Sequence, residues 1–242
     1  MEKEKANEQF EQLLAQNIVF KCLDDQQRSL VANQAIQSSF SKGEFITHLG
    51  DAWPFLFMVQ QGEIIATIDS DEGRSFVVAT FEPGDIFWGL AFFQDAAPMP
   101  VALEATVESH IHLWGREALL PVLLENGHMS WELNRLLVHQ MLTARKIVAE
   151  LAFQPVTSRL ARLLLDQFKP TAGDQVTREF TLDEMASRIG TTREMVCRIL
   201  YKFSDEGAIQ INRTEFTFIE PDALLRHANM HKNIGSQNSA GC

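Results

Sequence analysis

The stretch from Thr191 to Phe203 divides into two faces when it is placed on a helix of about 100° per residue. Its apolar face holds Met195, Val196, Ile199, Leu200 and Phe203. Its polar face holds Arg193, Glu194, Cys197, Arg198 and Tyr201. We expect such a helix to pack by one face and to leave the other free. Two arginines and a glutamate near its N-terminal end suit a helix laid into a DNA major groove, where the first residues touch base edges.

Capping signals frame this helix. Thr181 and Glu184 form the pattern of a capping box and open a helix that stops at Gly190. Thr191 and Glu194 repeat the pattern at the start of the polar-faced helix. A helix, a tight turn with glycine and a second capped helix with one polar face predict a helix-turn-helix.

The residues that follow predict a winged form of this motif. Gly207 ends the second helix, and alternating apolar residues at 209–212 and 215–219 predict a two-stranded wing. Glu179-Phe180 indicates a further short strand before the motif. The tail at 228–242 is poor in large apolar side chains, so we expect it to be disordered.

Between residues 18 and 113 the chain consists of short β-rich runs separated by glycines. The runs are 37–40, 45–48, 55–59, 64–68, 75–81 and 105–113. The tetrapeptide Asp71-Glu72-Gly73-Arg74 is typical of a hairpin turn. Short strands with no long helix between them predict an all-β roll.

A long helix is predicted after this β-rich part. Pro121 is expected to interrupt a short helix at 116–126, and Ser130 to cap a helix that runs to about Ala152. One stripe of the long helix, apolar except for its glutamine, has spacings of four and three: Leu133, Leu137, Gln140, Ala144, Ile147 and Leu151. A second stripe holds Trp131, Val138, Met141 and Val148. Two apolar faces favour two neighbours, the β-roll and a partner chain in coiled-coil fashion, and a helix buried in its own domain is the alternative.

Charge is distributed unevenly on either side of Pro155, which ends the long helix and marks a domain boundary. An amphipathic helix is predicted directly after it, at 156–168. Residues 1–153 hold 10 Lys and Arg against 21 Asp and Glu, whereas residues 154–227 hold 10 against 11. An acidic first part with a nearly neutral second part is compatible with DNA binding, and it predicts weak non-specific affinity because few phosphates would be neutralised.

Composition excludes several classes of protein. No run approaches the roughly 18–20 apolar residues of a membrane span, and the N-terminus lacks a signal-peptide pattern. We therefore expect a soluble, cytoplasmic protein without a membrane partner. The three cysteines, Cys22, Cys197 and Cys242, are scattered and odd in number, which argues against a disulfide framework and against a clustered metal site.

An all-β roll, a long helix, a hinge and a winged helix-turn-helix resemble the CRP/FNR superfamily of bacterial transcription regulators. The resemblance is strongest at 181–211, where Thr-Arg-Glu-x-Val-x-Arg-x-Leu is followed by Asp-Glu-Gly-x-Ile. Glu150-Leu151-Ala152-Phe153 resembles the hinge of the family, and Gly62-Glu63 and Gly84-Asp85-Ile86-Phe87 resemble turns of its roll.

The resemblance implies an α+β fold in four parts. A cyclic-nucleotide-binding-like β-roll (jelly roll) would occupy 1–128 as the sensor, and a dimerisation helix with hinge 129–153. A winged helix-turn-helix would occupy 154–227, followed by the tail. The implied function is a homodimeric, sequence-specific regulator of transcription without enzymatic activity, with RNA polymerase as a further partner.

In that family the helix matching 193–205 reads DNA. The resemblance places Arg193, Glu194 and Arg198 on base edges, because an arginine fork suits guanine and a carboxylate suits cytosine. Thr191 and Thr192 would contact phosphate at the helix N-terminus. Cys197 and Tyr201 share the same face. A dimer predicts a two-fold symmetric operator with half-sites about one helical turn apart.

The roll departs from the cyclic-AMP-binding pattern of the family. The ribose-binding glutamate position is Gly89, and the phosphate-binding arginine position falls at about Met99. A cyclic phosphate buried without a cation would be costly, so cyclic AMP is not expected as the effector. The alternatives are an apolar pocket for another effector or a roll filled by its own side chains. The candidate pocket residues are Trp88, Gly89, Phe92, Phe93, Met99, Met141, Ala144 and Arg145.

Other chemistries remain as alternatives. An iron–sulfur cluster would need more than Cys22, and we predict no bound cofactor and no metal site. A haem ligand would come from one of the histidines His48, His110, His112, His128 and His139. His110 and His112 share a strand face and, with Glu117, resemble part of a cupin metal site, so a cupin-like metal-dependent enzyme is a further alternative. A regulator without a ligand, controlled by its abundance, is the last alternative.

Overall fold

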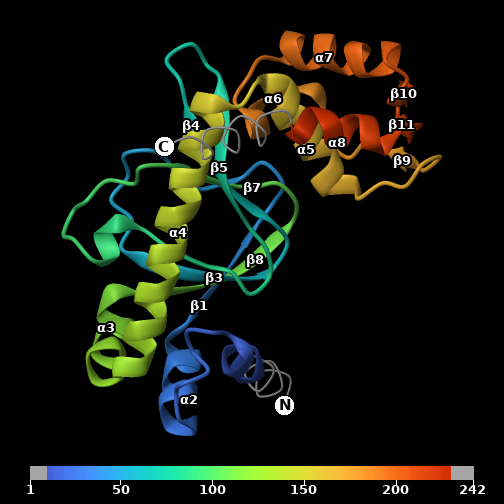
Figure 1. The fold of residues 1–242 in the computed structure, drawn as a ribbon. Coiled ribbons are helices and arrows are strands. Elements are labelled where there is room, and N and C mark those ends of the chain that lie inside the picture. The colour runs from blue at the N-terminus through green and yellow to red at the C-terminus, as the bar shows by residue number, and fades with distance from the viewer. Residues whose placement is uncertain (1–9, 230–242) are drawn as a thin grey trace, which may run out of the picture. The chain divides into compact units, whose positions relative to one another are not determined.

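The computed structural model describes residues 10–229, which fall into two compact units. One unit contains the chain up to Ile68 together with Val78–Ala144. The other contains Asp69–Val77 together with the chain from Arg145 onward. Figure 1 shows the helices and strands of both units.

The first unit is built on two four-stranded antiparallel sheets, as the sequence predicts for a β-roll. One sheet has the order β1-β8-β3-β6 and the other β2-β7-β4-β5. The strands are β1 Ile36–Phe40, β2 Phe45–Thr47, β3 Phe55–Gln61, β4 Ile64–Asp69, β5 Ser75–Phe81, β6 Ile86–Trp88, β7 Ala102–Ala105 and β8 Ser109–Gly115. Phe57, Leu103 and Ile111 belong to a core formed by residues of both sheets, because successive side chains of a strand alternate between its two faces.

The run expected at 105–113 is two strands rather than one. A turn at 106–108 separates β7 from β8, and hydrogen bonds to Glu63 hold it. The Thr106 amide donates to the Glu63 carbonyl over 3.0 Å, and the Ser109 hydroxyl oxygen accepts from the Glu63 amide over 3.2 Å. Glu63 lies more than forty residues earlier in the chain than Thr106 and Ser109, so local periodicity did not reveal the turn.

Helices pack on the outside of the roll. Residues 10–16 are helical, followed by α2 Asp25–Gln34, the short 3-10 helix η1 Leu90–Phe92, α3 Arg116–Glu125 and the start of α4 Gly127–Phe153. Phe20, Trp114 and Met129 belong to the apolar cluster that they form with the roll. The Trp114 indole donates to the Val31 carbonyl over 2.8 Å, so the largest buried side chain of this cluster also has a polar partner.

Two boundaries predicted around the long helix are wrong. Pro121 lies inside α3 without ending it. Ser130 lies inside α4, and its hydroxyl donates to the Leu123 carbonyl. Asn126 has the capping role instead, since its side-chain oxygen accepts from the Met129 amide over 3.0 Å.

Both apolar stripes predicted for α4 are largely exposed in the single chain, and burial is confined to the start of the helix. Met129 and Leu133 are buried against the roll. Leu137, Met141 and Val148 lie within about 40° of one another on the helix surface, and all three are exposed in the single chain, with 62% of Met141 accessible. Burial of the whole helix within its own domain is therefore wrong, and α4 presents a continuous apolar face.

The second unit contains a helix-turn-helix and a small sheet. Its elements are α5 Val156–Phe168, β9 Gln175–Thr177, α6 Leu182–Ile189, α7 Arg193–Asp205, β10 Ile209–Ile211, β11 Glu215–Phe218 and α8 Pro221–Asn229. The wing predicted at 209–212 and 215–219 forms β10 and β11, and β9 extends it to a three-stranded antiparallel sheet. Leu164, Phe203 and Phe216 are fully buried in the core of this unit.

Two predictions for this unit are corrected. The short strand is not Glu179-Phe180 but β9. This strand pairs with β11, and Val176 lies opposite Phe216. Ala228 belongs to α8 and is buried, so the prediction of disorder is wrong for residues 228 and 229. Residues 230–242 lie outside the described part of the chain.

The hinge sequence Glu150–Phe153 forms the last turn of α4. The Arg159 guanidinium donates to the carbonyls of Glu150 and Leu151, each over 3.3 Å, and so satisfies groups that a helix end leaves without partners. The Glu150 carboxylate pairs with Arg162 at 3.3 Å. This end of α4 is therefore held to α5 by charged groups.

Within residues 10–229, none of the helices is long and apolar enough to span a bilayer.

Candidate nucleic-acid interface

The first helix of the motif begins as its sequence predicts. The Thr181 hydroxyl accepts from the Glu184 amide over 3.2 Å, and the Glu184 carboxylate accepts from the Thr181 amide over 2.6 Å. This reciprocal capping box confirms the predicted start of α6. Gly190 ends the helix in the left-handed conformation, with φ of 63°, which favours glycine.

The second helix starts one residue later than predicted. The amides of Gly190 and Thr191 both donate to the Ala186 carbonyl, which ties Thr191 to the end of α6. Thr192 is therefore the N-cap of α7, and its hydroxyl accepts from the Met195 amide over 3.3 Å. The second capping box, Thr191 with Glu194, is wrong for this reason.

The predicted division of α7 into two faces is confirmed. Val196, Ile199, Leu200 and Phe203 are buried in the core of the unit, and Met195 packs against them. The opposite face is accessible. Arg193, Glu194, Arg198 and Tyr201 are exposed there, and Cys197 is half-buried. Thr191 is half-buried in the turn and Thr192 exposed at the cap, so the structure brings all seven predicted DNA-contacting residues onto one continuous segment.

The charged side chains of this face form ion pairs in the free protein. The Arg193 guanidinium lies 3.1 Å from the carboxylate of Asp183 on α6. Arg198 lies 3.1 Å from Glu194, one turn earlier on the same helix. Both pairs are largely exposed, and exposed pairs of this kind are worth about 0.2–1 kcal/mol each. Breaking these ion pairs to contact a ligand would therefore cost little free energy.

Asp183 is the residue of this surface that the sequence analysis missed. It lies ten residues before Arg193, on the other helix of the motif. Its place in the first turn after the capping box was visible in the sequence, but its pairing with Arg193 depends on how α6 and α7 cross.

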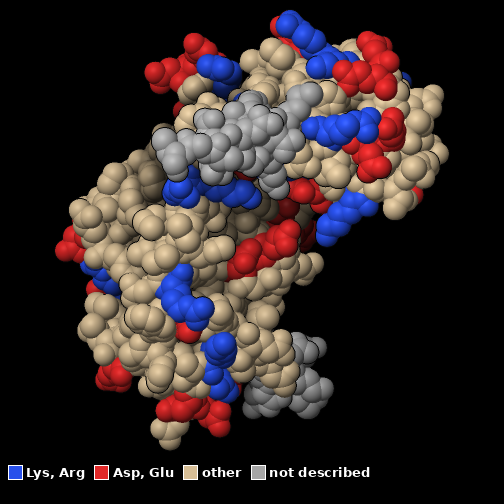
Figure 2. Space-filling model, viewed as in Figure 1, with Lys and Arg blue, Asp and Glu red and all other residues tan. Residues whose placement is uncertain are grey.

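No large basic patch accompanies these residues in the view of Figure 2, where blue and red side chains are interspersed over the C-terminal unit. Two of its arginines lie over aromatic rings, Arg188 over Phe180 at 4.4 Å and Arg178 over Phe216 at 5.1 Å. The nearly neutral charge of residues 154–227 is thus spread over a mixed surface.

Among the eight candidate effector residues, the structure brings the rings of Trp88 and Phe92 against that of Phe93, with centroids 6.0 and 5.0 Å apart. Trp88 and Phe92 are buried in the cluster between roll and helices, whereas Met99 is buried in the cluster between the sheets. Phe93 is 54% exposed, and Met141, Ala144 and Arg145 are exposed on α4. At Gly89 an added Cβ would lie 1.8 Å from the Trp53 carbonyl oxygen, so the backbone there excludes any side chain.

Arg74 and Arg116, the arginines that flank 75–115 in the sequence, pair with other groups. The Arg116 Nε donates to the Phe92 carbonyl over 2.7 Å, and its Nη1 pairs with Asp95. Arg74 pairs with Glu72 at 2.8 Å. Arg116 thus fastens the segment around η1 instead of facing a ligand phosphate.

The histidines proposed for a metal site have different environments. His112 is buried, and its ring stacks on that of Phe10 at 3.5 Å between centroids. Burial lowers the pKa of His112 to about 4 because the charged form is poorly solvated there. The His110 Nδ1 lies 2.8 Å from the Ser39 hydroxyl, and Glu117 is exposed on α3. Across the described range, no three His, Cys, Asp or Glu side chains converge in a metal-binding arrangement.

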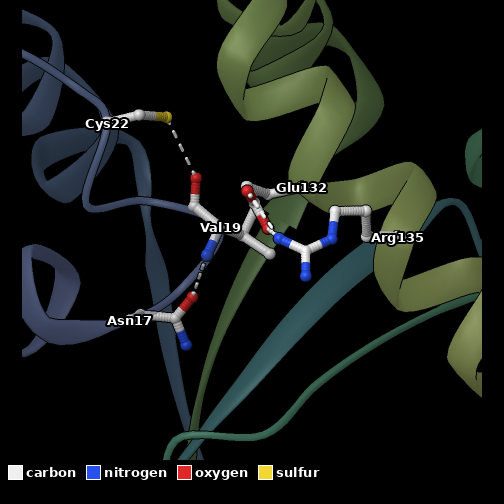
Figure 3. A network of polar contacts seen from close by, with 5 residues as sticks. All are labelled: Asn17, Val19, Cys22, Glu132 and Arg135. Atoms are coloured by element: carbon white, nitrogen blue, oxygen red, sulfur yellow. Dashed lines mark hydrogen bonds and ion pairs between the residues drawn. The ribbon is translucent and has the colours of Figure 1, made fainter.

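Cys22 lies in the segment that joins the N-terminal helices (Figure 3). Its thiol donates to the Val19 carbonyl over 3.4 Å, while the Asn17 side chain accepts from the Val19 amide over 2.9 Å. Burial raises the pKa of the Cys22 thiol, which makes it less nucleophilic. Nearby on α4, Glu132 pairs with Arg135 at 3.1 Å. These contacts are typical of a structural cysteine.

Two family models match separate parts of the chain. The cyclic nucleotide-binding domain matches residues 37–126, and the Crp-like helix-turn-helix domain matches residues 158–227. A Mycobacterium tuberculosis protein described as a CRP-like cAMP-activated global transcriptional regulator is 24% identical over 224 residues, which cover 90% of this chain and 99% of that protein. The cAMP-activated global transcriptional regulator Vfr of Pseudomonas aeruginosa is 25% identical over 173 residues, covering 69% of this chain and 81% of Vfr.

Solved structures agree on the fold. A putative regulator of the crp/fnr family from Eubacterium rectale has a TM-score of 0.72 at 20% identity, covering 87% of this chain and 97% of that one. The c-di-GMP responsive regulator CLP of Xanthomonas campestris has a TM-score of 0.69 at 19% identity, covering 77% and 95%. With the β-roll, long helix and helix-turn-helix in this order, the chain belongs to the CRP/FNR superfamily of DNA-binding transcription regulators.

Proposed function

We propose that this protein is a homodimeric transcription regulator that reads a two-fold symmetric operator with α7, in response to a signal other than cyclic AMP. The observation that carries the proposal is the free face of α7. It presents two arginines and a glutamate over its first two turns, while the opposite face is anchored in the core. A helix presented in this way fits the major groove.

The base contacts follow from hydrogen-bonding chemistry. Arg193 and Arg198 offer forks that suit the O6 and N7 acceptors of guanine, and Glu194 offers an acceptor for the N4 amino group of cytosine. The Thr192 hydroxyl oxygen accepts from Met195, which leaves its hydrogen free to donate to a phosphate. Thr191 lies beside it in the turn, and Cys197 and Tyr201 extend the same face towards the next bases.

Dimerisation is supported by the apolar face of α4. A helix that buries apolar residues of its first turns against its own roll and exposes those further along is suited to packing against a second copy of itself. A two-fold axis between two copies of α4 would present two copies of α7, and this requires two half-sites.

The roll supports a signal other than cyclic AMP. The backbone at Gly89 has no room for a ribose-binding carboxylate, and Arg116 is engaged by Phe92 and Asp95. Relatives described as cAMP-activated therefore do not define the effector of this chain. The burial of Trp88, Phe92 and Met99 in core clusters favours the second candidate, a regulator without a ligand whose output follows its abundance.

Selection of binding sites from random DNA tests the proposed function. The full chain should enrich a palindromic sequence whose two halves are about 10–11 base pairs apart, centre to centre. Footprinting should show protection of both halves. Enrichment of a single asymmetric site, or of no sequence, would contradict a dimer that reads DNA through two copies of α7.

Calorimetric titration with cyclic AMP tests the proposed signal. We expect no saturable heat at nucleotide concentrations up to about 1 mM, a limit of about −4 kcal/mol in binding free energy. Operator affinity should be the same with and without the nucleotide. The M. tuberculosis relative, titrated in parallel, serves as the positive control. Micromolar binding to this chain would overturn the proposal about the signal but not the proposal about DNA reading.

A further inference from the structure

Asp183 stands beside the proposed reading surface without belonging to α7. Its Oδ2 lies 3.1 Å from the Nη1 of Arg193, across the turn of the motif. Both side chains are about two-thirds exposed, at 67% and 66%. The other ion pair of this surface, Glu194 with Arg198, joins two proposed base readers to each other. Asp183 differs from Glu194 because it is not itself a proposed base reader. Its carboxylate can therefore stay paired with an arginine that contacts a base.

The helix dipole favours the charge of Asp183 and disfavours the charge of Arg193. Asp183 lies in the first turn of α6, where the helix dipole stabilises a negative charge. Arg193 is the first residue of α7, where the dipole disfavours a positive charge. A carboxylate beside this guanidinium compensates for that unfavourable position and restricts a side chain that otherwise has many rotamers.

The donor geometry of arginine lets the contact coexist with base reading. A guanidinium carries five N–H donors in one plane, and the contact with Asp183 uses Nη1. The remaining donors are enough for a bidentate contact to the O6 and N7 of guanine. The carboxylate and the base can therefore occupy different edges of the same guanidinium.

We propose that Asp183 is a positioning residue that orients Arg193 for guanine and so sharpens the specificity of the regulator. The inference rests on the proposed function, because it takes Arg193 to be a base reader. Asp183 carries a negative charge close to a surface that would meet phosphates, so it lowers affinity for DNA of any sequence. In return, Asp183 increases the discrimination between bases at the base pair that Arg193 contacts.

Asp183→Asn separates these two effects. The guanine read by Arg193 is first identified as the operator position at which substitution weakens the wild-type protein but has no effect on Arg193→Ala. At that position, Asp183→Asn should reduce discrimination between guanine and adenine by about 2- to 5-fold, as expected for the loss of an exposed ion pair. Affinity for non-specific DNA should stay the same or rise. A merely structural residue would instead lower the melting temperature and weaken all DNA binding together.

Three further variants complete the experiment. Asp183→Glu should restore part of the discrimination. Asp222→Asn removes the same charge from the first turn of α8 and should leave discrimination unchanged. In an Arg193→Lys background the effect of Asp183→Asn should vanish, since lysine lacks the planar fork.

Unchanged or increased discrimination in Asp183→Asn would overturn the inference, and so would a uniform loss of affinity. If no operator position depends on Arg193 in the wild-type protein, the assignment of Arg193 as a base reader fails, and the Asp183 inference fails with it. An Arg193-dependent position that is insensitive to Asp183 overturns the inference alone.

Discussion

Arg193→Ala is expected to lower affinity for the selected operator by at least about 30-fold. A bidentate contact to guanine is worth about 1–3 kcal/mol, and a dimer makes it in both half-sites. Non-specific affinity should fall only slightly, because one cation among several near the backbone is lost per subunit. Fluorescence anisotropy with labelled operator and with scrambled DNA at one fixed salt concentration measures both quantities.

Arg226→Ala is the matched control for this variant. Arg226 is also exposed and paired with a carboxylate, Glu220 at 2.8 Å, but it lies on α8. The Arg226→Ala variant should bind the operator with the same affinity as the wild-type protein. An equal loss in the two variants would indicate a general effect of charge and would refute base reading by Arg193.

Met141→Glu is expected to convert the dimer to monomers at micromolar concentration. Met141 lies at the centre of the exposed apolar face of α4, with Leu137 and Val148 beside it. A carboxylate buried there in two copies would lack a counter-charge, and burying such groups costs several kcal/mol. Sedimentation velocity measures the oligomeric state, and operator affinity should fall by about 100-fold or more because the half-sites would be bound independently.

His139→Glu supplies the control on the same helix. His139 is exposed and lies about 160° around α4 from Met141, so the new charge stays in water. This variant should remain dimeric with unchanged circular dichroism. A dimer that survives Met141→Glu but dissociates with His139→Glu would show that the interface uses a different face of α4.

Helix α7 was the most predictable part of the molecule. Its two faces follow from helical periodicity over thirteen residues, 193–205, and the burial of Val196 and Phe203 confirms the apolar one. The capping box of Thr181 with Glu184 was equally predictable because both hydrogen bonds span three residues. The first residue of α7 was not, because Thr191 is held by the Ala186 carbonyl at the end of the preceding helix.

The boundaries of α3 and α4 also could not be predicted from local sequence signals. Pro121 and Ser130 are strong local signals for a break and a cap, yet α3 continues through the proline and α4 begins before the serine. Packing of Leu119, Val122 and Met129 into one apolar cluster accounts for this, since tertiary burial outweighs the local preference of one residue. The short helix α8 was missed because only nine residues carry its pattern.

The sequence by itself determined the order of the parts, the two faces of α7 and the wing. These features depend on residues close together in the chain or on residue type alone. Only the tertiary structure decided that Asp183 meets Arg193, that Trp88 and Met99 lie in separate cores, and which face of α4 remains exposed. Such contacts depend on how helices and sheets pack against one another, and periodicity within a single element carries no information about its neighbour.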